Sequence, residues 1–141
     1  MIFDELTIHT DGGARGNPGP AAIGVTIYHQ DTLIHEFGKV IGETTNNVAE
    51  YTAVIEALQW IHTQQIANQG THIHFFCDSL LIVNQLKGLF KIKDGKLKDL
   101  AIAVHMLEKR VGGIPTYTAI RRELNKQADS LVNKALDADI H

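Results

Sequence analysis

The sequence lacks the features of a secreted or membrane-bound chain. It has one cysteine in 141 residues, so no internal disulfide can form, and a disulfide scaffold or a cysteine-based zinc site is not expected. No apolar stretch approaches the roughly 20 residues that span a bilayer. The first ten residues, MIFDELTIHT, carry two acids where a signal peptide needs a basic patch and an apolar run. We therefore expect a protein of the cytoplasm that has no membrane partner.

Segments that would divide the chain are also missing. Only three residues are proline, and there is no internal repeat, low-complexity tract or Ser/Pro/Gly-rich linker. With 44% hydrophobic and 21% charged residues the composition is that of an ordinary globular protein. A domain of this size buries roughly two thirds of its unfolded surface. We expect residues 1–141 to form a single domain.

The chain has no excess of positive charge, but its net charge of −3 is the sum of an acidic half and a basic half. Residues 1–86 hold two basic residues against nine acidic ones, a net charge of −7, and residues 87–141 hold eleven against seven, a net of +4. The densest basic segment runs from Lys87 to Lys98. An acidic half favours metal binding and a basic patch favours phosphate binding, although a lysine run taken alone is more often a solvated helix face.

Hydrophobic periodicity indicates a mixed α/β domain. It predicts strands at 5–10, 21–29, 32–41, 71–77 and 115–120, and helices at 46–65, 79–86, 97–110 and 124–138. Three strands joined by hairpins are followed by strand–helix–strand crossovers. Such crossovers make the later strands parallel to the first.

Four carboxylates are expected to meet at one end of this sheet. Asp11 and Asp78 each follow a predicted strand directly, and functional sites of open α/β sheets lie beyond the carboxyl ends of parallel strands. Glu50 and Asp129 lie in the first turns of two predicted helices and could reach the same end. Carboxylates without clustered Cys or His suit Mg²⁺ or Mn²⁺.

Each acid also has an ordinary structural explanation. Residues 47–50 fit a capping box in which Glu50 closes the first turn, and Asp129 could complement a helix dipole. Asp78 precedes a serine as many helix starts do, and Asp11 precedes two glycines as in a turn. The convergence of all four on one sheet end is what favours a site.

The chain closely resembles type 1 ribonuclease H in four segments that occur in the family's order and spacing. They are TDGGARGNPGPAAIG (10–24), TTNNVAEYTAVIEAL (44–58), CDSLLIVNQLKG (77–88) and RELNKQADSLVNKA (122–135). The resemblance implies the ribonuclease H fold, a five-stranded mixed sheet flanked by helices. It also implies hydrolysis of the RNA strand of RNA/DNA hybrids, leaving 5′-phosphate and 3′-hydroxyl ends.

By this resemblance Asp11, Glu50, Asp78 and Asp129 are the catalytic metal ligands. Phosphodiester hydrolysis suits two Mg²⁺ ions roughly 4 Å apart, with Mn²⁺ as a substitute, one activating the attacking water and one stabilising the leaving oxygen. We assign Asp11 to bridge them, Asp78 and Asp129 to the nucleophile side, and Glu50 to the leaving-group side. Glu50 is also expected to accept a hydrogen bond from the 2′-OH that distinguishes RNA from DNA.

The resemblance further implies a set of substrate-binding residues. Asn17, Asn46 and Asn47 would contact the minor groove and Thr45 a DNA phosphate, although Asn47 could instead be a helix cap. The expected contacts with the hybrid, with the glycines admitting its backbone beside Asp11, are Gly12, Gly13, Asn17, Thr45, Asn46, Asn47, Lys91, Lys93, Lys96 and Arg122.

Two departures from the best-known members point to a compact subgroup. Those members carry a histidine in a loop before the last helix, where this chain has Arg121 and Arg122 and no histidine. They also carry an extended basic protrusion, of which only the segment from Lys87 to Lys98 remains. No separate hybrid-binding domain is expected at the N-terminus, and we expect a monomer without an obligate protein partner.

Other interpretations remain open. DNA-cutting relatives such as integrases share the acids but not TTNN or GNPG, and non-catalytic relatives typically lose acids. His72 and His74 lie on one strand face, but no third metal ligand is suggested nearby, so a structural role is favoured. Phe90 is the one aromatic residue worth testing for base stacking.

Overall fold

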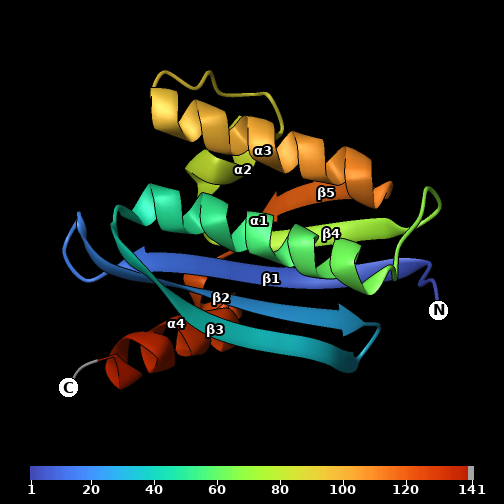
Figure 1. Ribbon diagram of the computed structural model, residues 1–141, viewed down its shortest axis with the longest axis horizontal. Coiled ribbons are helices and arrows are strands. Elements are labelled where there is room, and N and C mark those ends of the chain that lie inside the picture. The colour runs from blue at the N-terminus through green and yellow to red at the C-terminus, as the bar shows by residue number, and fades with distance from the viewer. Residues whose placement is uncertain (140–141) are drawn as a thin grey trace.

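The computed structural model describes residues 1–139 and contains one five-stranded sheet of order β3-β2-β1-β4-β5 (Figure 1). Its strands are β1 (Glu5–Ala14), β2 (Gly19–His29), β3 (Thr32–Thr44), β4 (His72–Cys77) and β5 (Ile114–Ala119). Its helices are α1 (Asn46–Gln64), α2 (Leu80–Leu86), α3 (Gly95–Val111), the short 3₁₀ helix η1 (Arg122–Leu124) and α4 (Lys126–Ala138). The predicted mixed sheet flanked by helices is confirmed.

Strand directions follow from the connections. The hairpins make β1, β2 and β3 antiparallel neighbours, whereas the crossovers through α1 and through α2–α3 make β4 parallel to β1 and β5 parallel to β4. The carboxyl ends of β1 and β4 therefore lie side by side at one edge of the molecule, as expected.

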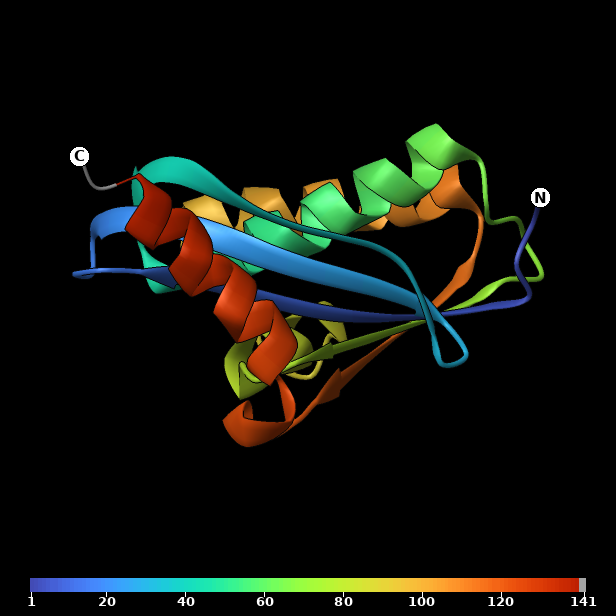
Figure 2. The ribbon, with the colours of Figure 1, turned by 90° about the horizontal axis from the view of Figure 1, so that it is seen from below.

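Helices cover the sheet unequally. Helices α1 and α3 lie on one face, where the main core forms, and α4 crosses β2 and β3 on the other face (Figure 2). A Cβ on Gly24 would lie 2.2 Å from the carbonyl oxygen of Ala128, and one on Gly38 would lie 2.5 Å from that of Leu131. Both glycines are thus required for α4 to pack directly on the strand backbones, which places Asp129 over the sheet.

Two of the ordinary structural explanations and the predicted start of the last helix are wrong. Asp11 is not followed by a turn, because β1 continues to Ala14 and the chain turns at Gly16, whose φ of +90° favours glycine. The cap of α1 is Thr45, whose hydroxyl accepts a hydrogen bond from the amide of Val48, so residues 47–50 do not form a capping box. The last helix begins at Lys126, after a separate 3₁₀ turn.

Within residues 1–139 no helix combines the length and apolar character needed to cross a membrane.

Candidate active site

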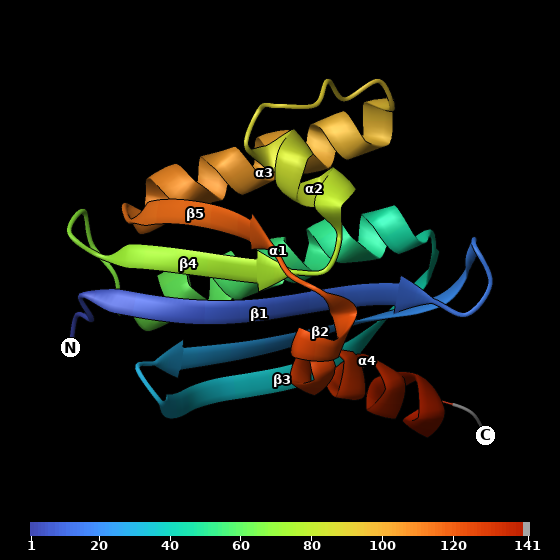
Figure 3. The ribbon, with the colours of Figure 1, turned by 180° about the vertical axis from the view of Figure 1, so that it is seen from behind.

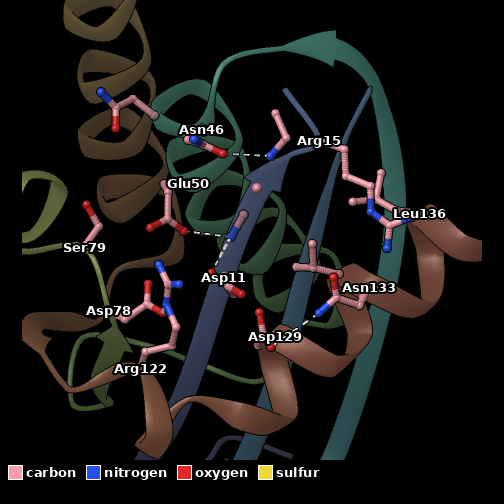
Figure 4. Close-up of a pocket in the computed structure, with 15 residues that line it drawn as sticks. Asp11, Arg15, Asn46, Glu50, Asp78, Ser79, Arg122, Asp129, Asn133 and Leu136 are labelled. Carbon is pink, nitrogen blue, oxygen red and sulfur yellow. Dashed lines mark hydrogen bonds and ion pairs between the residues drawn. The ribbon is translucent and has the colours of Figure 1, made fainter. Parts of the chain in front are cut away.

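The four predicted carboxylates gather around one cavity at the carboxyl ends of β1 and β4 (Figure 4). Carboxylate oxygens of Asp11, Glu50 and Asp78 lie within 4.8 Å of one another. Asp129, from the first turn of α4, lines the same cavity of about 370 Å³. The acids thus come from a strand, from two helices and from a strand-to-helix turn, and they meet at one place.

The amide of Gly12 holds two of the acids together. It donates to Oε1 of Glu50 over 2.7 Å and to Oδ1 of Asp11 over 3.0 Å. A Cβ on Gly12 would lie 2.3 Å from the carbonyl carbon of Ala49, so only glycine lets the first turns of α1 approach β1 this closely. Gly13 has no such neighbour, its nearest being 3.9 Å away, and it lines the cavity.

Burial and mutual repulsion alter the acidity of the cluster. Burial, together with the charges of Asp78 and Asp129, raises the pKa of Asp11 to about 7. Burial, followed by the charges of Asp11 and Asp78, raises the pKa of Glu50 well above its usual value. These carboxylates are therefore costly to keep charged together without a cation among them.

Arg122 partly offsets the charge on one side of the cluster. Burial raises the pKa of Asp78, the charge of Arg122 opposes that shift, and Asp129 adds to it. Nε of Arg122 lies 3.7 Å from Oδ2 of Asp78, and its side chain is 85% exposed. The guanidinium is free to change its orientation because solvent, not packing, surrounds it.

Two asparagines fix Asp129. The side-chain amide of Asn125, buried just before α4, donates to the carbonyl oxygen of Thr10 over 2.9 Å and ties the helix start to β1 beside Asp11. Asn133, one turn later, donates to Oδ2 of Asp129 over 3.4 Å. Neither asparagine belongs to the predicted site, because only the packing of α4 on the sheet brings them to it.

The donor set fits a hard divalent cation. The grouped side chains that could bind an ion are all carboxylates, and the buried Cys77 is not among them. A cation would remove the repulsion that raises the pKa values of Asp11 and Glu50. The acidic cluster is thus consistent with metal binding.

The asparagines expected to read the substrate hold the rim of the cavity. Oδ1 of Asn46 accepts a hydrogen bond from the amide of Ala14 over 2.8 Å, and Oδ1 of Asn17 accepts one from the amide of Asn46 over 3.0 Å. Asn46 and Asn47 line the cavity, whereas Thr45 uses its hydroxyl as the helix cap. Asn47 is not that cap.

The predicted lysines lie apart from the carboxylates. Lys91 and Lys93 belong to the α2–α3 connection and Lys96 to the first turn of α3, and all three are exposed. This connection lies at the sheet end where β1 terminates (Figures 1 and 3). Phe90, 46% exposed, accompanies them. The patch can therefore meet only a ligand that extends well beyond the cavity.

Arg15 lines the cavity but was not among the predicted site residues. It lines the cavity from the β1–β2 turn, and its guanidinium lies 2.6 Å from Oδ1 of Asp137 near the end of α4. Both side chains are largely exposed, and such surface pairs contribute little stability. Only the long-range packing of α4 against this turn shows where Arg15 points.

Removing the charge of Asp11 should stabilise the metal-free protein at high pH. The raised pKa means that folded Asp11 holds its proton up to about pH 7, whereas in the unfolded chain it loses it near its ordinary value of 3.8. The contribution of Asp11 to the stability of the folded state is therefore complete below about pH 4 and is lost as pH rises through about 7. We expect Asp11→Asn to raise the melting temperature by several degrees near pH 8 in chelator, and by little near pH 4.

Thermal unfolding of both proteins across this range would test the clustering of the acids. The exposed turn residue Asp31 supplies a control, since Asp31→Asn removes a charge without relieving the cluster. Equal melting temperatures of Asp11→Asn and the parent at every pH would show that the carboxylates do not repel.

Comparisons with known proteins agree with this geometry. The family described as "Reverse transcriptase-like" matches residues 9–135. The structure superposes with a TM-score of 0.90 on LC11-RNase H1 solved in complex with an RNA/DNA hybrid, at 40% identity over 96% of this chain and 99% of that one. RNase H1 of Halobacterium salinarum superposes with a TM-score of 0.87 at 34% identity, over 95% of this chain and 98% of that one.

Curated relatives are longer than this chain. A bifunctional protein of Mycobacterium tuberculosis is 36% identical over 95% of the chain, which spans 36% of that protein. Ribonuclease HI of Halobacterium salinarum is 37% identical over 90% of the chain, which spans 62% of it. The likeness to the two RNase H1 structures covers nearly all of this chain and of each of theirs. The sheet is the expected five-stranded mixed sheet, and the acids converge as the motifs require. The chain belongs to the type 1 ribonuclease H family.

Proposed function

We propose that residues 1–141 form one catalytic domain that hydrolyses the RNA strand of RNA/DNA hybrids, leaving 5′-phosphate and 3′-hydroxyl ends. The observation that carries this proposal is the buried cluster of Asp11, Glu50 and Asp78, with Asp129 on the same cavity. LC11-RNase H1, which is similar to this chain over almost its whole length, was solved with an RNA/DNA hybrid bound. The same kind of duplex is the proposed substrate here, bound by one chain.

The four acids would hold Mg²⁺, with Mn²⁺ as a substitute. When bound, two such ions lower the pKa of an attacking water and neutralise charge on the phosphate and the leaving oxygen. Asp11 lies between Glu50 and Asp129 in the cavity, which suits a ligand shared by both ions (Figure 4). Glu50 uses Oε1 to accept from Gly12, so Oε2 remains for a cation or a 2′-hydroxyl.

The rest of the chain would position the duplex. Gly13, Asn46 and Asn47 line the cavity beside the acids, where a sugar–phosphate backbone can approach the main chain. Arg122 would bind a phosphate of the substrate. It would also take the place of the histidine that better-known members carry near the attacking water. The lysine patch would neutralise phosphates farther along the duplex.

Cleavage of matched duplexes would test the proposal. Labelled RNA/DNA, RNA/RNA and DNA/DNA duplexes of one sequence are incubated with Mg²⁺, with Mn²⁺ and with chelator. We expect cutting of the RNA strand of the hybrid alone, dependent on the cation. Cutting of the DNA duplex would indicate an integrase-like activity, and binding without any cutting would indicate a non-catalytic module.

The lysine patch should control the salt dependence of hybrid binding. Replacing Lys91, Lys93 and Lys96 by Ala should weaken binding of all hybrid sequences alike. It should flatten the plot of log affinity against log salt by up to about 0.9 for each phosphate that is no longer neutralised, the value for B-DNA being an upper limit. Fluorescence anisotropy in chelator, where no cleavage occurs, provides the measurement.

The control removes cations at the other end of the same helix. Lys109 and Arg110 lie in the last turn of α3, away from the cavity, so their replacement by Ala should leave the slope unchanged. If the variant without Lys91, Lys93 and Lys96 has the same slope of log affinity against log salt as the parent, the lysines do not contact the hybrid and only form a solvated surface.

A further inference from the structure

Two histidines and a glutamate lie close together at the opposite end of the sheet from the acids. In β4, His72 and His74 alternate with the buried Ile73 and therefore point to the face that α1 and α3 leave open. The parallel register pairs Glu5 of β1 with His72, and Thr116 of β5 with His74. Side chains paired in this way share a face and lie about 5 Å apart.

Both ring nitrogens of His74 have a polar neighbour. Its Nδ1 lies 3.0 Å from Oγ1 of Thr116, and its Nε2 lies 3.7 Å from Oε1 of Glu5. A neutral ring with its proton on Nδ1 donates to Thr116 and directs the lone pair of Nε2 toward the carboxylate. Metal-binding histidines are commonly oriented in this way, by a hydrogen bond from the ring nitrogen that does not bind the ion.

His72 supplies a second imidazole beside the first. The two rings are nearly parallel, at 11°, with centroids 6.1 Å apart. His72 is exposed, so its ring can change rotamer and bring a nitrogen toward Nε2 of His74 without disturbing the core. The Glu5 side chain is 58% exposed and that of His74 31%, so an ion can reach all three from solvent.

We propose that Glu5, His72 and His74 bind a borderline divalent transition metal, with zinc as the representative ion, and that Thr116 positions His74. Two imidazoles and one carboxylate form a donor set that zinc uses, with the fourth position left to water. Mg²⁺ prefers oxygen ligands, so the acidic cluster would be its site instead. Binding would link the start of β1 to β4 and raise the stability of the folded chain.

Zinc titration in the presence of excess Mg²⁺ would test this site. Mg²⁺ occupies the acidic cluster, and calorimetry then reports zinc binding elsewhere. We expect one site in the parent, weakened at least tenfold by His72→Ala or His74→Ala, and also weakened by Glu5→Gln. Thr116→Val should weaken it by about 10–100-fold, the usual effect of losing a hydrogen bond to a metal-binding histidine.

His105 supplies the matched control. Its Nδ1 lies 2.9 Å from Oε1 of Glu108, so it has a carboxylate partner but not the paired imidazole of β4. His105→Ala should therefore bind zinc with the parental affinity. The expected zinc-dependent rise in melting temperature should likewise persist in His105→Ala and disappear in His72→Ala.

A measurement on the unaltered protein makes the test independent of how the variants fold. In NMR spectra, zinc should shift the ring protons of His72 and His74 but not those of His105. The proposal is overturned if the parent does not bind zinc in excess Mg²⁺. It is equally overturned if His72→Ala and His74→Ala both bind zinc as the parent does, or if zinc leaves the two ring signals unmoved.

Discussion

Asp11→Asn should lower the rate of hybrid cleavage in Mg²⁺ by at least about a thousandfold while leaving the fold intact. Asp11 contacts the amide that also holds Glu50, and its pKa responds to both Asp78 and Asp129, so it is at the centre of the cluster. Losing a ligand shared by two ions should remove several kcal/mol of transition-state stabilisation, and about 1.4 kcal/mol corresponds to a factor of ten. Asparagine keeps the shape of the side chain and removes only the charge.

The measurement is kcat on a fixed hybrid at saturating Mg²⁺, with the melting temperature as the check on folding. Asp31→Asn removes the same charge from an exposed turn at the other end of the sheet and should retain the parental rate. A rate for Asp11→Asn within about tenfold of the parent would contradict the bridging assignment.

The meeting of Asp11 and Asp78 could be predicted because it depends on local patterns. Alternating apolar residues indicate where β1 and β4 run, and Asp11 and Asp78 come at or directly after the last alternating residue. The crossover rule then makes the two strands parallel, which brings their ends together. Convergence of the acids therefore follows from the sequence and from general rules of sheet topology.

The start of α1 could not be predicted in the same way. Thr44, Thr45, Asn46 and Asn47 are four successive residues that can each cap a helix. The choice of Thr45 depends on a contact from the preceding hairpin, where Asn17 accepts a hydrogen bond from the amide of Asn46. Because Asn17 is distant in sequence from α1, local propensity alone could not exclude the alternative of a capping box over residues 47–50.

The glycines after Asp11 show a similar limit. A pair of glycines is typical of a turn, yet Gly12 and Gly13 continue β1 and pair with Ile23 and Ala22. The missing side chain of Gly12 is required by Ala49 of α1, which approaches the strand from across the core. Only the packed structure distinguishes a glycine needed for flexibility from one needed for space.

Discrimination between RNA and DNA should depend on several hydroxyl contacts acting together. A neutral hydrogen bond contributes about 0.5–1.5 kcal/mol, so one 2′-hydroxyl read by Glu50 gives only modest selectivity. The cavity rim extends the contact surface, since Asn46 and Asn47 line it next to Glu50 and Gly13 presents bare main chain there. A run of ribonucleotides can fill these contacts at once, whereas a single one cannot.

We therefore expect a duplex with one ribonucleotide in a DNA strand to be cut about a hundredfold more slowly than one with four, since three further hydrogen bonds contribute roughly 3 kcal/mol to positioning the phosphate. The measurement is kcat/KM on duplexes of one sequence that carry one, two, four or eight consecutive ribonucleotides opposite DNA. The rate should rise steeply up to about four and then level off, because ribonucleotides beyond the cavity rim touch phosphate-binding groups that do not distinguish the sugars. Equal rates on all four duplexes would show that 2′-hydroxyl contacts are not the basis of selection.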